Sequence, residues 1–539
     1  MSMFGDYKSY KKFEPVYPDW KNRRDLKEAK REGYLNLHPE LINRGDIQRG
    51  EILLRAIDIM DEYSQKKAEN MEAATEPVIS MGLEFSSLLG MAAGGLLGSI
   101  KPIGKFFAKI VAKGSKYKKL AGIGVPAAIG FVAGTLAAFP LMAWGARAEV
   151  SASRKGRFEA MRNELKNPNG FAVLTEKQME DALDFSRAVV LEEDKKKSLT
   201  KKLTGGLSSL KDMATDSKEY KQQKKLFELE ILEDEKNIDR ELSEEEILAA
   251  KRDQQLLTKL IEKIDIASQD YAENSELATQ TAILGIGATG GILSIGLEKI
   301  LTKMKVQSAQ KIGAITKSLS VAAFLIMGIF AAQINKHASR VGRYKVKQEL
   351  MKNPNNFVYV DDTKADEIKD AEVIPHKKQN IFSFLINCWK ENREYMKYKK
   401  TIGKDERRLF KAMEEIELSP EQLKAAKQLQ KNTFRTFNKI DENSQKYAEN
   451  IEALGQAIAY PINTVFSIIA AVFATPYLMK EAKNNVEKAQ NYSKYFGIVA
   501  LSLIPAIIIN AIINKEQKKA SRIADMKTID ELNDYRKFA

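Results

Sequence analysis

Six apolar stretches interrupt a chain that is otherwise rich in charge. They run from Val78 to Ile100, Leu120 to Ala146, Leu277 to Leu297, Ser318 to Asn335, Ala453 to Met479 and Tyr495 to Asn514. Glu84 is the single charged residue within them. A helix crosses the hydrocarbon core of a bilayer with roughly 20 apolar residues, so each stretch predicts a membrane span. The stretches form three close pairs, and each pair predicts a helical hairpin.

A charged segment before each pair of stretches predicts a long helix. Ser243–Glu246 and Ser419–Gln422 match the capping box, in which two side chains satisfy each other's backbone N–H groups. No glycine or further proline follows either box for more than 30 residues, so continuous helices are expected. The corresponding first segment contains Gly45 and Gly50, which predict a shorter or broken helix.

The segments around the hairpins repeat three times. A twelve-residue motif directly before each hairpin has seven identical positions in its three copies, which begin at Asp61, Asp265 and Asp441. An upstream pattern, Tyr-x-x-x-Lys-Lys, begins at Tyr7, Tyr220 and Tyr395. A pattern Ser-Arg-x-Gly-Arg follows two hairpins, at Ser153 and Ser339, and a degraded copy follows the third, at Ser521. Recurrence of several markers in one order predicts a triplicated unit.

The markers set the boundaries of the three expected units. Two copies continue into Asn-Pro-Asn, at Asn167 and Asn353, which we take as the ends of the first two repeats. The expected repeats cover residues 1–171, 207–357 and 381–539. Linkers are expected over residues 172–206 and 358–380, where glycine, aspartate and proline interrupt the helical pattern.

On a helix, the acidic and amide side chains of the twelve-residue motif line up along one stripe, beside an apolar seam. The stripe comprises Asp61, Gln65, Glu69, Glu72, Asp265, Gln269, Glu273, Glu276, Asp441, Gln445, Glu449 and Glu452. The seam precedes it at Ile57, Met60, Ile261, Ile264, Phe437 and Ile440. The segment that returns from each hairpin carries basic side chains at a matching depth, namely Arg154, Arg157, Arg340, Arg343, Lys519 and Arg522.

Two roles for this acidic stripe are open. The acids can pair with the returning basic residues and hold each hairpin in register, for example Glu273 or Asp265 with Arg340 or Arg343. Alternatively, the three equivalent glutamates that include Glu273 can form an acidic ring at the mouth of a pore. The sequence favours the ion pairs, because half-exposed carboxylates usually serve packing and solvation.

Composition leaves little chemistry for an enzyme. Cys388 is the single cysteine, and the three histidines lie far apart in the sequence. These numbers exclude a disulfide framework and a cysteine-based metal cage, so we expect no enzyme, cofactor or metal site. A GxGxxG pattern begins at Gly285, but it lies inside an apolar stretch and has no preceding strand. Such glycines, and Gly90 and Gly94, instead predict close helix packing.

The distribution of charge indicates which partners the chain is expected to bind. The chain has 86 Lys and Arg against 72 Asp and Glu, a formal net charge of +14. In the first hairpin's connector, one side of a predicted amphipathic helix carries Lys101, Lys105, Lys109 and Lys113. This pattern is typical of helices that lie on anionic lipid head groups. No nucleic-acid-binding motif occurs, so nucleic acid is not expected as a partner. Glu84, a carboxylate inside a predicted span, is a further candidate functional residue.

Together these patterns predict an all-α integral membrane protein with six spans. Each of three tandem repeats would contain a long polar helix, a two-span transmembrane hairpin and a basic return helix. Without an export signal, both termini are expected on the cytoplasmic side of a cytoplasmic or inner membrane. We expect a non-enzymatic scaffold, organiser or docking platform that binds anionic lipids and a cytoplasmic protein partner or a second copy. The alternative is a transporter or channel with its pathway between the three hairpins.

Overall fold

The computed structural model describes six continuous segments, residues 3–111, 151–189, 241–264, 337–371, 381–451 and 515–539, with single residues and short runs between them. Within these ranges every regular element is helical, which confirms the all-α part of the prediction there.

The described elements are helices of very different lengths. In chain order they are α1 (Met3–Phe13), α2 (Tyr17–Leu37), η1 (Pro39–Leu41), α3 (Arg44–Ser99), α4 (Lys101–Val111), the π-helical η2 (Ala160–Glu164), η3 (Pro168–Phe171), α7 (Glu176–Ser186), η5 (Pro354–Phe357), α11 (Asp362–Ala365), α12 (Ile381–Lys400), α13 (Ile402–Met413), α14 (Pro420–Ser444), the π-helical η6 (Gln445–Glu449) and η7 (Tyr535–Phe538). Further helical runs cover residues 151–159, 244–264, 337–352 and 515–531.

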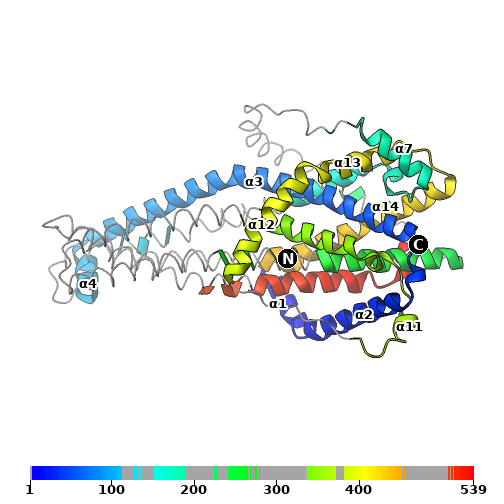
Figure 1. Cartoon of the computed structure of the whole chain (residues 1–539). Helices are drawn as coiled ribbons and strands as arrows, with labels where there is room; N and C mark the ends of the chain where they lie inside the picture. Colours follow the sequence, from blue (N-terminus) through cyan, green and yellow to red (C-terminus); the bar gives the residue numbers. More distant parts are fainter. Residues whose placement is uncertain are drawn as a thin grey trace, which may run out of the picture.

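Two sets of helices organise the three repeats. The helices that precede the hairpins, here called the leading helices, are α3, the helix over 244–264 and α14. The helices that follow the hairpins, here called the return helices, cover 151–159, 337–352 and 515–531. In Figure 1, α3 runs from the group of helices that contains both termini out to α4, at the opposite end of the molecule.

The first leading helix is neither short nor broken, so that prediction is wrong. Helix α3 is 56 residues long, and the side chain of Asn43 caps its start by accepting a hydrogen bond of 2.8 Å from the backbone N–H of Asp46. Gly50 serves packing, because a Cβ atom at that position would lie 2.1 Å from the ring of Phe357. Tertiary contact therefore overrides the low helix propensity of glycine.

The other two leading helices begin as predicted. At Ser243 the side-chain oxygen accepts a 3.2 Å hydrogen bond from the backbone N–H of Glu246, whose carboxylate accepts one of 3.2 Å in return. Ser419 and Gln422 form the same reciprocal pair, at 3.2 and 3.0 Å. Both capping boxes are confirmed.

The apolar seam forms the centre of the protein. All six predicted seam residues, Ile57, Met60, Ile261, Ile264, Phe437 and Ile440, are at most 7% exposed and belong to one core cluster. The three leading helices thus bury equivalent positions together, which confirms the seam. Burying one large apolar side chain of this kind contributes about 1.5–3 kcal/mol to the stability of the fold.

The structure contains a third copy of the turn that ends each repeat. In η3 and η5, the side chains of Asn167 and Asn353 accept a hydrogen bond from the backbone N–H two residues later, and Asp534 does the same in η7. Each turn ends in a phenylalanine that is at most 2% exposed in the same core, namely Phe171, Phe357 and Phe538. The third copy has Asp-Tyr-Arg in place of Asn-Pro-Asn, so the sequence pattern does not reveal it.

The prediction of an integral membrane protein with six spans, and of its place in a cytoplasmic or inner membrane, is wrong. Across the described residues, no helix combines the length and the apolar character that crossing a membrane requires. Helix α3 contains most of the first predicted span, Val78–Ile100, but the side chains of residues 78–84 lie outside the described residues. The other five predicted spans lie outside the described residues, apart from single positions and short runs.

The glycine-based packing of the first hairpin is confirmed. A Cβ atom at Gly90 would lie 2.0 Å from the carbonyl oxygen of Gly130, and one at Gly94 would lie 2.0 Å from that of Pro126. At the next position, the one contact of a Cβ atom at Gly95 with a described residue would be with the Cβ of Ala127, at an ordinary 3.8 Å. Helix α3 therefore approaches its neighbour along one narrow face.

This difference between adjacent glycines makes a matched test. We expect Gly94→Ala to lower the free energy of unfolding by about 1–3 kcal/mol, because the backbones must separate. Gly95→Ala should leave it unchanged or raise it by about 0.5–1 kcal/mol through helix propensity. Urea denaturation followed by circular dichroism measures both. Equal effects of the two substitutions would contradict the close approach at Gly94.

An inter-repeat charge junction as candidate functional site

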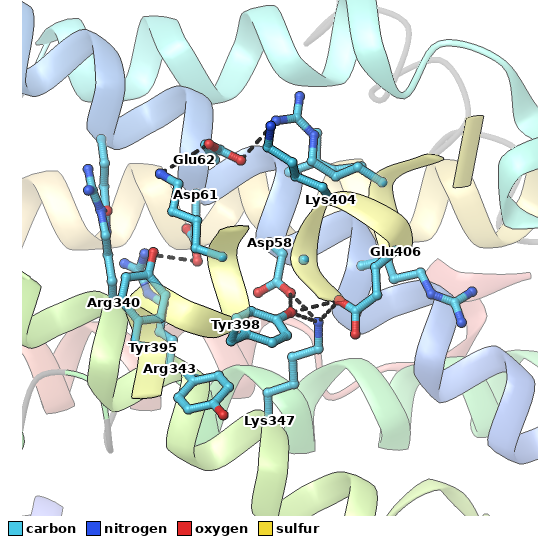
Figure 2. Close-up of a pocket in the computed structure, with 17 residues that line it drawn as sticks. Asp58, Asp61, Glu62, Arg340, Arg343, Lys347, Tyr395, Tyr398, Lys404 and Glu406 are labelled. Carbon is cyan, nitrogen blue, oxygen red and sulfur yellow. Dashed lines mark hydrogen bonds and ion pairs between the residues drawn. The ribbon is translucent and has the colours of Figure 1, made fainter. Parts of the chain in front are cut away.

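A small charged cavity lies where α3, the second return helix, α12 and α13 meet (Figure 2). Its volume is about 110 Å³. Its ionisable walls carry four carboxylates, Asp58, Asp61, Glu62 and Glu406, and seven cations, Arg55, Arg340, Arg343, Lys347, Lys399, Lys404 and Arg407. Tyr344, Tyr395, Tyr398 and Gln65 add uncharged polar groups to its lining. We call this set of residues the charge junction.

Lys347 lies at the centre of one half of the charge junction. Its ammonium group donates to the hydroxyl of Tyr398 at 2.7 Å and to the carboxylates of Glu406, at 2.5 Å, and Asp58. Tyr398 in turn donates to Glu406 at 2.7 Å. Figure 2 shows these side chains converging from α3, the second return helix, α12 and α13. The lysine is 5% exposed, so its charge is compensated almost entirely by protein groups.

The surroundings shift the proton affinity of these groups. Burial disfavours the ammonium form of Lys347, but the carboxylates of Asp58 and Glu406 outweigh burial and raise its pKa above the ordinary value. Burial is also the main cause that raises the pKa of Asp58, against the opposing effect of Lys347. Burial raises the pKa of the Tyr398 hydroxyl as well, so this group remains a hydrogen-bond donor. Lys347 is therefore the charge that allows two carboxylates to lie together.

The other half of the charge junction joins the first motif to the second return helix. Arg343 lies 2.9 Å from the carboxylate of Asp61, and the guanidinium of Arg340 donates to Gln65 and Glu69. The predicted partners of these arginines within their own hairpin, Asp265 and Glu273, lie outside the described residues. The observed pairs thus connect repeat 2 to repeat 1.

A second set of pairs follows the same rule between repeats 1 and 3. Arg154 of the first return helix donates to Glu449, and Arg157 donates to Asp441. Arg157 also lies 3.8 Å from Asp61 of its own repeat. In both sets, arginines of a return helix pair with the motif of the preceding repeat. Repeat 3 here counts as the repeat that precedes repeat 1, so the order is cyclic.

Small residues explain why the arginines reach a neighbouring repeat. A Cβ atom at Gly156 would lie 2.3 Å from the carbonyl oxygen of Tyr63, and the hydroxyls of Ser64 and Ser153 are 2.6 Å apart. A Cβ atom at Gly342 would likewise lie 2.8 Å from the Cα of Ser268. The first and second return helices therefore pack their glycine faces against their own motifs. Arginines on the remaining faces point toward the next repeat.

The Tyr-x-x-x-Lys-Lys helices are placed by the same cyclic order. Helix α12 of repeat 3 packs on the second return helix, where Tyr395 lies beside Tyr344 and His337. Helix α1 of repeat 1 packs on the third return helix, where Tyr10 donates to Glu516 at 3.1 Å. Tyr10 and Tyr398 hold the same place in the marker. The repeated marker is therefore a sequence signal that could have identified Tyr398 as a site residue. Asp58, Lys347 and Glu406 belong to no repeated marker, so no signal in the sequence pointed to them.

Other predicted residues lie apart from the charge junction. Lys101, Lys105 and Lys109 are exposed on α4, while Lys113 lies outside the described residues. Lys519 pairs with Glu14 and Glu516 at 2.6 and 3.5 Å. Arg522 lies on the same return helix. Gln269, Glu276 and Glu452 lie outside the described residues, as do the side chains of Glu72, Glu84 and Gln445.

The arrangement of the charge junction suits packing between repeats better than bond chemistry. In the described part of the chain, no group of three or more His, Cys, Asp or Glu side chains could hold a metal ion. Cys388 is buried in α12, and burial raises the pKa of its thiol to about 11. A thiol of this kind is protonated at neutral pH and is a poor nucleophile.

Comparison with known proteins adds no relative. No family model matches the chain, and neither the curated proteins nor the solved structures contain a match.

Proposed function

We propose that the protein is a non-enzymatic docking scaffold that presents α4 to the anionic head groups of a lipid surface. The observation that carries the proposal is the place of α4, an amphipathic helix at the end of α3 remote from the bundled helices (Figure 1). Lys101, Lys105 and Lys109 recur at four-residue spacing and are all exposed. Phe106, on another face, is 60% exposed. Exposed aromatic and basic groups on one short helix are the features of interfacial helices.

The end of α3 that carries α4 adds apolar area to this contact. Leu88, Leu89, Leu96 and Leu97 of α3 are between 52% and 71% exposed. Contiguous exposed apolar side chains of this size typically mark a surface that another body covers. A head-group region offers both negative charge for the lysines and an apolar boundary for these leucines.

The bundled helices support the scaffold part of the proposal. The shared seam and the ion pairs between repeats join the three units into one body. Every charge-junction carboxylate lies against a basic side chain, and these groups hold helices in place without a reactive residue between them. A body of this kind suits the rigid presentation of a docking helix.

Vesicle binding tests the proposal. The full chain should sediment with phosphatidylglycerol vesicles and much less with phosphatidylcholine vesicles, and added salt should weaken the binding. Because each lysine near an anionic surface contributes about 1 kcal/mol, substituting Lys101, Lys105 and Lys109 with Gln should weaken binding about 100-fold.

The control carries the same change of charge on α12. Lys390, Lys397 and Lys400 are exposed there, and their substitution with Gln should leave vesicle binding within about twofold. Phe106→Ser should weaken binding without changing its dependence on salt. Equal binding to both vesicle types, or an equal loss in the α12 control, would refute the role of α4.

A further inference from the structure

A second cleft lies between α2 and the third return helix, away from the charge junction. Its volume is about 560 Å³, within the range of about 300–1,000 Å³ that small-molecule sites occupy. Phe13, Val16, Trp20, Met526 and Ile529 supply apolar and aromatic walls. Val16 is 50% exposed at the start of α2, which leaves part of this apolar lining open to a ligand.

Two cations in this cleft form no ion pair with any described residue. Arg23 is exposed, and its Nε donates weakly, at 3.4 Å, to the carbonyl oxygen of Asp19 in its own helix. The ammonium of Lys527 lies 3.7 Å from the centre of the Phe13 ring. A cation held over an aromatic ring keeps its capacity to bind an anion.

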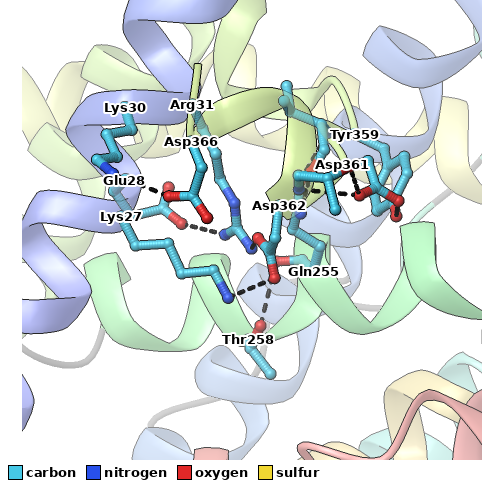
Figure 3. Close-up of polar contacts among 12 residues, drawn as sticks. Lys27, Glu28, Lys30, Arg31, Gln255, Thr258, Tyr359, Asp361, Asp362 and Asp366 are labelled. Atoms are coloured by element: carbon cyan, nitrogen blue, oxygen red, sulfur yellow. Dashed lines mark hydrogen bonds and ion pairs between the residues drawn. The ribbon is translucent and has the colours of Figure 1, made fainter. Parts of the chain in front are cut away.

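The other charged groups of the cleft are already engaged. Arg24 pairs with Glu262 at 2.9 Å, and Lys27 pairs with Asp362 at 2.6 Å in the network of Figure 3. The carboxylate of Asp530 accepts a 3.2 Å hydrogen bond from the indole N–H of Trp20. Arg23 and Lys527 therefore remain as the two cations that a ligand can neutralise.

We propose that this cleft binds a small organic anion, a phosphate or carboxylate group attached to an apolar or aromatic body. The guanidinium of Arg23 can donate two parallel hydrogen bonds to such a group, and Lys527 adds a second positive charge. The apolar walls would cover the body of the ligand, and Trp20 and Phe13 provide rings against which it can stack. This proposal is independent of lipid binding by α4.

Phenyl phosphate is a suitable probe, because it joins the two features. The full chain with Trp144→Phe and Trp389→Phe retains Trp20 as its single tryptophan, and its fluorescence reports on the cleft. Isothermal titration calorimetry on the unsubstituted chain gives a second, independent measure. We expect saturable binding by both methods. Benzyl alcohol, which lacks the charge, and inorganic phosphate, which lacks the ring, should each bind at least tenfold more weakly.

Substitutions assign the site. Arg23→Gln and Lys527→Gln should each weaken phenyl phosphate binding about tenfold, the value of one charge-assisted contact. Lys12→Gln, an exposed lysine on α1 that does not line the cleft, should leave binding unchanged. Circular dichroism checks that each variant is folded. Absence of saturable binding by calorimetry, or equal affinity in all variants, would overturn the proposal.

Discussion

Replacing Lys347 with methionine is expected to lower the free energy of unfolding by about 2–3 kcal/mol. Methionine keeps the length of the side chain but leaves Asp58 and Glu406 together without their shared cation. Removing one partner of a fully buried ion pair costs about 3–5 kcal/mol, and the loss here should be smaller, because the side chains of Asp58 and Glu406 are 39% and 26% exposed and remain partly solvated. Urea denaturation followed by circular dichroism gives the value.

The matched control for this substitution is two residues away. Lys345 lies 2.8 Å from Glu391, but its side chain is 38% exposed. Lys345→Met should therefore cost less than about 1 kcal/mol. Adding Asp58→Asn to Lys347→Met should restore part of the loss. If Lys347→Met proved no more harmful than Lys345→Met, Lys347 would not be the centre of the charge junction.

Acid should partly repair the Lys347→Met variant. In the folded chain burial already raises the pKa of Asp58, and loss of Lys347 removes the main charge that opposes this rise. A carboxyl group whose folded pKa lies above its unfolded pKa destabilises the fold as pH rises through that interval. The stability deficit of the variant should therefore shrink as pH falls toward 4 and Asp58 takes up a proton.

Mutation of Arg157 should show that ion pairs join different repeats. Arg157→Ala leaves Asp61 and Asp441 facing each other without the guanidinium, and we expect a loss of about 2–4 kcal/mol. In a double-mutant cycle, Arg157 and Asp441 should show a coupling free energy of about 1–3 kcal/mol. The cycle of Arg157 with Asp61, 3.8 Å away in the same repeat, should give a smaller value.

An exposed pair sets the baseline for these cycles. Arg187 and Asp184 lie 3.1 Å apart with side chains that are 82% and 77% exposed. Their coupling should stay below about 0.5 kcal/mol. A stronger coupling of Arg157 to Asp61 than to Asp441 would mean that the arginine stabilises its own hairpin, and the cyclic pairing of repeats would be wrong.

Part of the fold could be predicted because it depends on local chemistry. The capping boxes at Ser243 and Ser419 need only side chains and backbone groups within one turn of helix. Seam residues such as Ile57 and Met60 share a helical face by spacing alone, and burial of that face follows from its apolar character. The glycine at position 50 misled the prediction, because its contact with Phe357 comes from a residue 307 positions away.

The apolar stretches show a different limit. An apolar run indicates that its side chains avoid water, but it does not state what takes the place of water. In the first hairpin, Gly90 and Gly94 face the backbone of Gly130 and Pro126, so protein supplies part of that environment. The prediction of membrane spans counted apolar residues and could not distinguish these cases.

By itself, the sequence determined the helical character, the triplicate markers and the residues that share each helix face, because all three depend on spacing along the chain. Only the tertiary structure decided which repeat each face meets. The spacing of Arg154, Gly156 and Arg157 places the glycine and the arginines on different sides of one helix, but it does not name the neighbours. Close contact of Gly156 with Tyr63 turns the arginines outward to Asp441 and Glu449. The charge junction exists because such contacts, over long sequence separations, bring the repeats together.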